Sequence, residues 1–178
     1  IYMDYMTAEI IDKANQSNVF YGQWEISLLH WFQGLHNKVL DPIMTLITHC
    51  GDAGYFWIAL TLLLLIIPKT RKLGVASFIG LFFSVLFTNI VLKNAFIRCR
   101  PCWLPYLLGN EAPDWMFHIK YLVSFPDDFS FPSGHSSASF ASATAIYAML
   151  KKGNKKWGVC ALVFATLIAL SRLYVCVH

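Results

Sequence analysis

The feature that most constrains this chain is a run of 20 residues, 73–92, without a single charged side chain. At about 1.5 Å per residue, a helix of this length spans roughly 30 Å, which is the thickness of the hydrocarbon core of a bilayer. Three further apolar runs cover 53–67, 133–150 and 157–177. Among acidic and basic side chains, these runs contain only one histidine and one arginine. These runs predict an all-α protein, a polytopic bundle of membrane helices.

Composition supports this interpretation. Hydrophobic residues make up 57% of the chain and charged residues only 13%, about half the charged fraction of a typical soluble domain. So much apolar surface also excludes a disordered chain, and 178 residues fit a single domain.

The expected organisation has two parts. Residues 1–23 form a polar N-terminal segment, and 24–178 form the membrane domain. Within the latter, 24–50 is expected to form short amphipathic helices at the interface. The expected transmembrane helices are about 54–67, 72–97, 133–150 and 157–177.

Two short basic loops orient the helices. Residues 68–72 and 151–156 hold seven of the fourteen Lys and Arg residues and no acid, so the positive-inside rule places both loops in the cytoplasm. The long loop 98–132 then lies on the outer side. Its many aromatic side chains are expected to lie against the headgroup layer.

A first polar cluster lies at the outer end of helix 72–97 and contains Lys93, Arg98, Arg100 and Pro101. Lys93 and Arg100 are seven residues apart and would share a helix face if the helix reached that far, although Pro101 is expected to end it. Taken alone, these cations fit snorkelling side chains at a helix end.

A second cluster opens helix 133–150. Pro132 rigidifies the approach, Ser133 is a candidate N-cap, and Gly134 lets the backbone come close to a ligand. Free N–H groups and the helix dipole at such an end attract phosphate. Taken alone, the segment fits a plain helix cap followed by an incidental His135.

A third cluster closes helix 157–177. Ser171 and His178 are seven residues apart and are expected to share a helix face, with Arg172 beside that face. An arginine inside an apolar helix is a functional candidate by default. The alternative is a structural ion pair within the bundle.

The charges of the two basic loops independently place all three polar clusters on the outer side. This shared location favours a functional site over a separate structural explanation for each cluster. Lys93, Arg100 and Arg172 then supply three cations for a phosphoryl group. Of His135 and His178, one can attack phosphorus while the other protonates the leaving oxygen. No Cys, His or Asp cluster has metal-ligand spacing, so we expect a reaction without metal or cofactor.

The three clusters together resemble the type 2 phosphatidic acid phosphatase (PAP2) superfamily, which includes the vanadium haloperoxidases. Its pattern is K-x6-RP, then PSGH, then SR-x5-H-x3-D. The matching residues are Lys93 with Arg100-Pro101, then Pro132-Ser133-Gly134-His135, then Ser171-Arg172 with His178. The resemblance covers about 54–178, and the family's amphipathic first helix fits 24–50.

The resemblance implies a role for each residue. His178 is the expected nucleophile that forms a phosphohistidine, and His135 is the expected general acid. Lys93, Arg100 and Arg172 are expected to hold the phosphate oxygens, with Ser133 and Gly134 adding hydrogen bonds and with Pro101, Pro132 and Ser171 as supporting residues.

The family pattern also contains an Asp four residues after the nucleophile and a final transmembrane helix. Both would follow His178, and the sequence begins at Ile1 rather than Met. We therefore expect a C-terminally truncated fragment that lacks the group fixing the tautomer of His178.

The resemblance implies an integral-membrane lipid phosphatase with its site on the outer face of a bacterial cell membrane. Bacterial relatives act on undecaprenyl pyrophosphate, phosphatidic acid or phosphatidylglycerol phosphate, and we prefer the first. The alternatives are a lipid phosphotransferase and a non-catalytic protein that binds or transports anionic lipids. The expected partners are membrane lipids and a lipid phosphate, with no nucleic acid.

Overall fold

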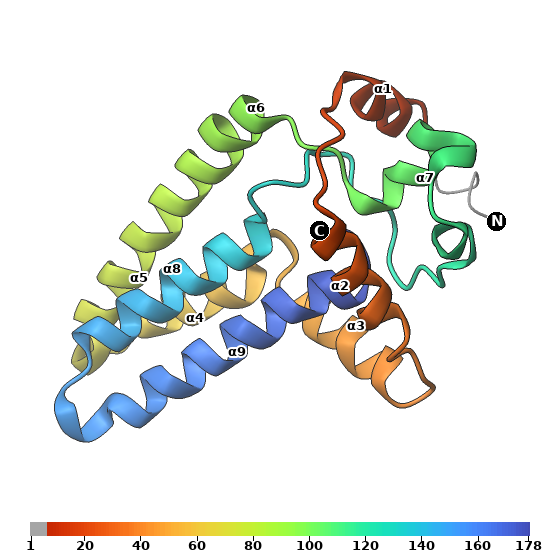
Figure 1. Ribbon diagram of the computed structural model, residues 1–178. Coiled ribbons are helices and arrows are strands. Elements are labelled where there is room, and N and C mark those ends of the chain that lie inside the picture. Colours follow the sequence, from red (N-terminus) through yellow and green to blue (C-terminus); the bar gives the residue numbers. More distant parts are fainter. Residues whose placement is uncertain (1–6) are drawn as a thin grey trace.

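The computed structural model describes residues 7–178 (Figure 1). Its helices are α1 (Ala8–Gln16), α2 (Gln23–Gln33), α3 (Leu40–Cys50), α4 (Tyr55–Ile66), α5 (Arg71–Val85), α6 (Lys93–Phe96), α7 (Leu104–Leu108), α8 (Gly134–Met149) and α9 (Lys155–Tyr174). A π-helical segment, Leu86–Leu92, joins α5 to α6. The described residues contain no β-strand, so the predicted all-α fold is confirmed.

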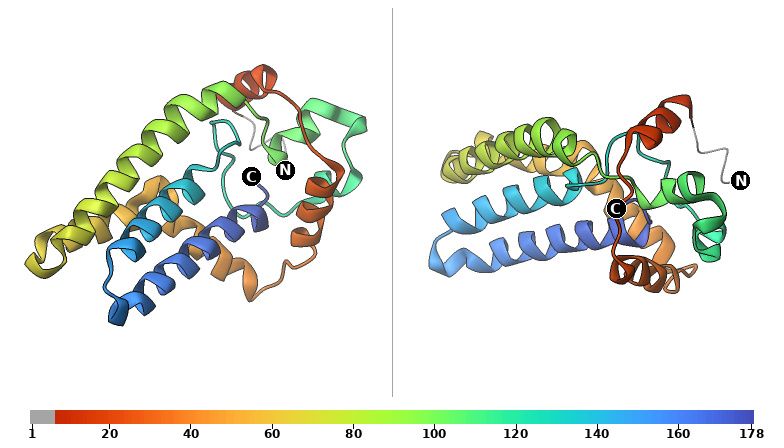
Figure 2. Two further views of the ribbon diagram at one scale, coloured as in Figure 1. Left: turned by 60° about the vertical axis from the view of Figure 1, so that its left-hand side comes forward. Right: turned by 45° about the horizontal axis from the view of Figure 1, so that its top comes forward.

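The bundle is formed by α4, α5, α8 and α9, with α3 packed on one side. The central helix α8 packs against α5 and α9, while α4 packs against α5 and α3 against α9. The α4–α5 and α8–α9 turns lie at one end of this bundle (Figures 1 and 2). The start of α8, the end of α9 and helix α6 lie at the other end, so the two basic loops are remote from all three polar clusters.

Two continuous helical stretches are long and apolar enough to cross a membrane: Pro68–Phe96 with 29 residues and Lys152–Tyr174 with 23 residues. The pair Leu40–Cys50 and Asp52–Ile66, bent by 48°, would make a third span. Helix α8 has 16 residues, or about 24 Å at the usual rise. That α8 also crosses the membrane stays a prediction.

The interior of the bundle contains buried hydroxyl side chains beside its apolar core. Thr61, Ser77 and Ser142 form a chain of two 2.6 Å hydrogen bonds that joins α4, α5 and α8. Large apolar side chains such as Phe78 and Phe82 are instead exposed. Small hydroxyl side chains let membrane helices approach closely and bond across the interface, while the apolar exterior suits lipid.

A second hydrophobic core lies beyond the site end of the bundle, where segment 98–132 packs with α1 and α2. Trp103 and Phe125 are buried there against Ile10 and Ala14 of α1. The expectation that the aromatic residues of 98–132 lie against headgroups is therefore wrong for the buried ones, because α1 covers them. The boundary at residue 23 stays a prediction, and residues 1–6 lie outside the described part of the chain.

The close approach of α8 and α9 depends on a glycine. A Cβ atom at Gly158 would lie 2.8 Å from the Cα atom of Tyr147. We expect Gly158→Ala to lower the thermal unfolding midpoint in detergent. The cost of overpacking, about 1–3 kcal/mol, should exceed the gain in helix propensity of about 1 kcal/mol.

The matched control is Gly153→Ala, since a Cβ atom at Gly153 would meet nothing within 4 Å. A Gly158→Ala protein as stable as this control would contradict the packing argument.

Candidate functional site

A polar pocket of about 310 Å³ lies at the end of the bundle opposite the basic loops. It is lined by His49, Asp52, Lys93, Arg100, Val123, Ser124, Pro126, Asp128, Gly134, His135, Arg172 and His178. The three cations and two histidines singled out by the sequence motifs are thus brought together around one cavity.

Lys93 and Arg100 reach the same pocket because the chain turns after α6. Helix α6 ends at Phe96 because Ile97 adopts a left-handed conformation with φ 39°. The helix does not reach Arg100, so the two cations do not share a helix face. Pro101 is buried as the first residue of the 3₁₀ turn Pro101–Trp103.

Arg100 is only 2% exposed and donates hydrogen bonds to two parts of the chain. Its Nε bonds the carbonyl oxygen of Asp128 at 2.6 Å, and its Nη1 bonds the carbonyl oxygen of Val177 at 2.6 Å. Nη1 also lies 3.0 Å from Nε2 of His178. A guanidinium group only donates, so this ring nitrogen is the acceptor.

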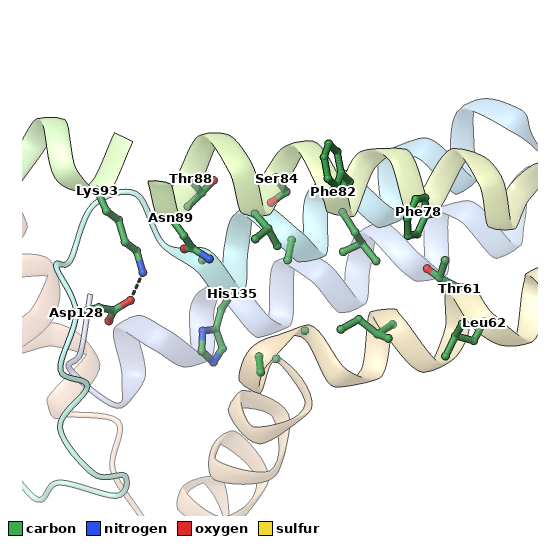
Figure 3. A pocket seen from close by; sticks show the side chains of 18 residues that line it. Thr61, Leu62, Phe78, Phe82, Ser84, Thr88, Asn89, Lys93, Asp128 and His135 are labelled. Carbon is green, nitrogen blue, oxygen red and sulfur yellow. Dashed lines mark hydrogen bonds and ion pairs between the residues drawn. The ribbon is translucent and has the colours of Figure 1, made fainter. Parts of the chain in front are cut away.

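The Asp128 carboxylate bridges the two cations. One oxygen pairs with Nη2 of Arg100, and the other pairs with Nζ of Lys93 (Figure 3). Burial raises the pKa of the Asp128 carboxyl, but Arg100 and Lys93 more than offset this, so its pKa lies below the ordinary value. An anion therefore already lies where these two side chains converge.

Arg172 approaches from α9 and is 4% exposed. Its Nη1 donates to Oγ1 of Thr48 in α3 at 2.9 Å. Nothing among residues 7–178 accepts a hydrogen bond from its buried Nε. The neighbouring Ser171 turns away from the pocket and donates to the carbonyl oxygen of Ile168 at 2.7 Å.

His178 does not share a helix face with Ser171, contrary to the expectation from their spacing. Helix α9 ends at Tyr174, and Cys176 has a left-handed φ of 57°. This turn brings His178 beside Arg100. Burial, together with the charges of Arg100 and Arg172, holds the pKa of His178 well below its ordinary value, so the ring is neutral at neutral pH.

The start of α8 has the predicted cap. The Oγ of Ser133 accepts from the backbone N–H of Ser136 at 3.4 Å. A Cβ atom on Gly134 would lie 3.8 Å from Nζ of Lys93, so the backbone here comes close to the cation. Pro132 and Ser133 line an adjoining hollow that also reaches His178.

Motif reasoning missed two acidic residues of the pocket. These are Asp128 in loop 98–132 and Asp52 in the turn between α3 and α4. Nε2 of His135 lies 2.9 Å from Oδ1 of Asp52, which is 83 residues away in sequence. The one local signal was the pair of glycines on either side of Asp52 and Ala53.

An apolar groove of about 520 Å³ continues from the polar pocket between α4, α5 and α8 (Figure 3). The two cavities share Lys93, Asp128, Gly134 and His135. The exposed side chains Ile58, Leu62, Phe78 and Phe82 line its far part. The combined shape suits a ligand with an anionic head and a hydrocarbon chain.

The arrangement can hold a tetrahedral oxyanion. Three cations and the N-terminus of α8 are directed at one cavity, with two imidazole rings beside them. Across residues 7–178, no group of three or more His, Cys, Asp or Glu side chains is arranged to hold a metal ion.

Comparison with known proteins agrees with the motifs. The model of the PAP2 superfamily matches residues 73–178, more than half of the chain. An undecaprenyl-diphosphatase of Sulfolobus acidocaldarius is 30% identical over 139 residues, which cover 78% of this chain and 60% of that protein. No solved structure matches. The resemblance drawn from the three motifs is therefore confirmed, and the chain belongs to the PAP2 superfamily.

Proposed function

We propose that this chain carries the catalytic site of an integral-membrane lipid phosphatase. The observation that carries the proposal is one pocket containing Lys93, Arg100, Arg172, His135 and His178, which continues into an apolar groove. The cations hold the phosphoryl oxygens, and the groove takes the hydrocarbon chain of the lipid.

In the first step a ring nitrogen of His178 attacks phosphorus. The new P–N bond forms as the P–O bond to the leaving group breaks, and His135 donates a proton to the departing oxygen. Arg100 already contacts the His178 ring, so an oxygen bound by Arg100 lies close to the attacking group. The low pKa of His178 keeps the ring neutral, and its Nε2 exchanges the hydrogen bond from Arg100 for the bond to phosphorus.

In the second step water attacks the phosphohistidine. His135, now neutral, takes a proton from that water, the P–N bond breaks, and inorganic phosphate leaves. Lys93, Arg100 and Arg172 stabilise the charge on the equatorial oxygens in both transition states.

The substrate class follows from the groove and from the relative. An apolar cavity leading to cations favours a lipid phosphate over a water-soluble one, and the similar Sulfolobus protein is named an undecaprenyl-diphosphatase. Undecaprenyl pyrophosphate is the preferred substrate, followed by phosphatidic acid and phosphatidylglycerol phosphate.

We expect His178→Ala and His135→Ala each to lower phosphate release from undecaprenyl pyrophosphate by at least about 100-fold, since positioned proton donors and nucleophiles contribute on this scale. Release is measured with the purified full-length protein in detergent micelles, and wild-type activity should be inhibited by orthovanadate. His118→Ala, at an exposed histidine outside the pocket, should retain full activity.

Wild-type activity in both pocket variants would refute the mechanism. Lipid binding or transbilayer movement without hydrolysis would instead support a non-catalytic protein. Phosphate recovered on an added acceptor would support a phosphotransferase.

Asp128 is expected to compete with the substrate, because its carboxylate pairs with both Lys93 and Arg100. We expect Asp128→Asn to tighten inhibition by orthovanadate about tenfold, equivalent to about 1.4 kcal/mol. The inhibition constant is compared with that of Asp127→Asn, which removes the same charge from an exposed neighbour outside the pocket. Equal constants in the two variants would show that Asp128 does not oppose anion binding.

We place the pocket on the extracytoplasmic side, since the basic loops at the opposite end favour the cytoplasm. A membrane-impermeant maleimide added to intact cells should label Asp127→Cys but label Gly153→Cys only after permeabilisation. Both changes are made in a background where Cys50 and the exposed Cys160 are serine. The reverse labelling would invert the topology.

A further inference from the structure

The turn between α3 and α4 adopts an unfavourable backbone conformation. Ala53 and Gly54 have consecutive positive φ angles of 48° and 71°. A left-handed non-glycine residue costs of order 1 kcal/mol and persists only where surrounding structure imposes it. The turn lies where the chain bends by 48° between the two helices, and it presents Asp52 to the polar pocket.

The backbone and the Asp52 side chain of the same turn contact the ring of His135. A Cβ atom on Gly51 would lie 2.7 Å from Cδ2 of His135, so only glycine lets the ring lie this close to the backbone. Beside it, Oδ1 of Asp52 accepts from Nε2 of the ring at 2.9 Å. Gly51 thus sets the position of the His135 imidazole, and Asp52 sets its orientation and tautomer.

We propose that Asp52 is a positioning residue for the proton-transfer role of His135, an inference that rests on the proposed function. With the Nε2–H donated to Asp52, Nδ1 is the nitrogen that exchanges protons. The protonated ring gives the Nδ1 proton to the leaving oxygen as the P–O bond breaks, and neutral Nδ1 later takes a proton from the attacking water. The Nε2–H stays on Asp52 in both steps.

The charges around His135 make this carboxylate necessary. The other titratable groups lining the pocket are His49, Lys93, Arg100, Asp128, Arg172 and His178. Three of these are cations, which oppose an imidazolium. Asp128 is engaged with Lys93 and Arg100, and His49 lies 4.0 Å from the second oxygen of Asp52. Among the described residues, Asp52 is the carboxylate that directly supports a charged His135.

We expect Asp52→Asn to lower kcat about 10- to 100-fold, the scale seen when a group that orients a histidine through its second ring nitrogen is removed. KM should change little, because Asp52 does not bind phosphate. The basic limb of the kcat–pH profile should move to lower pH, since the imidazolium loses its counter-charge. Asp52→Glu should restore part of kcat, and Asp114→Asn, at an exposed acid outside the pocket, should behave as wild type.

The leaving group provides a readout that a structural defect would not change. The p-nitrophenolate of p-nitrophenyl phosphate leaves without help from an acid, so Asp52→Asn should slow hydrolysis of this substrate much less than hydrolysis of phosphatidic acid, whose leaving alcohol must be protonated. A misfolded variant would lose both activities equally.

A double-mutant cycle locates the effect. Asp52→Asn should cost nothing further in a His135→Ala background, and additive losses would overturn the proposal. Equal losses on both substrates, or an unmoved basic limb, would overturn it too. Failure of wild-type protein to hydrolyse any lipid phosphate would refute the proposed function itself, so the two failures are distinguishable.

Discussion

The site end of the molecule depends on the satisfaction of one buried cation, Arg100. A guanidinium removed from water is costly unless its N–H groups find acceptors. Here they are provided by the segment around Asp128 and by the chain end at Val177 and His178. The Arg100 side chain therefore bonds loop 98–132 to the residues after α9, which also pack together in one hydrophobic cluster, and these bonds form one wall of the pocket.

Charge balance gives the two carboxylates of the pocket different roles. Asp128 lies between Lys93 and Arg100, where an incoming phosphoryl group would offer the same cations more oxygen atoms. Asp52 instead pairs with His135 and lies farther from His49. In the proposed mechanism the first acid is exchanged for substrate, whereas the second stays in place through the whole cycle.

The helical bundle was predictable because apolar runs and basic loops are local signals, and they also placed the motif residues at one end. Two shared helix faces, Lys93 with Arg100 and Ser171 with His178, were expected wherever the helices continued. Both helices end before the second residue of the pair, where Ile97 and Cys176 adopt left-handed conformations. Neither residue is a glycine or an asparagine. No sequence pattern indicates such a residue, because the surrounding packing imposes the conformation. Asp52 was missed for the related reason that its partner lies 83 residues away.

The apolar groove determines which concentration sets the rate at which a lipid ligand meets the pocket. Its far part is lined by exposed side chains of the bundle surface, including Phe78 and Phe82, which face lipid in a membrane. A tailed ligand lying there reaches the polar pocket by diffusing in two dimensions, without passing through water. Encounter is then governed by the number of such lipids per unit area of the leaflet, and dilution of the surrounding aqueous phase leaves it unchanged.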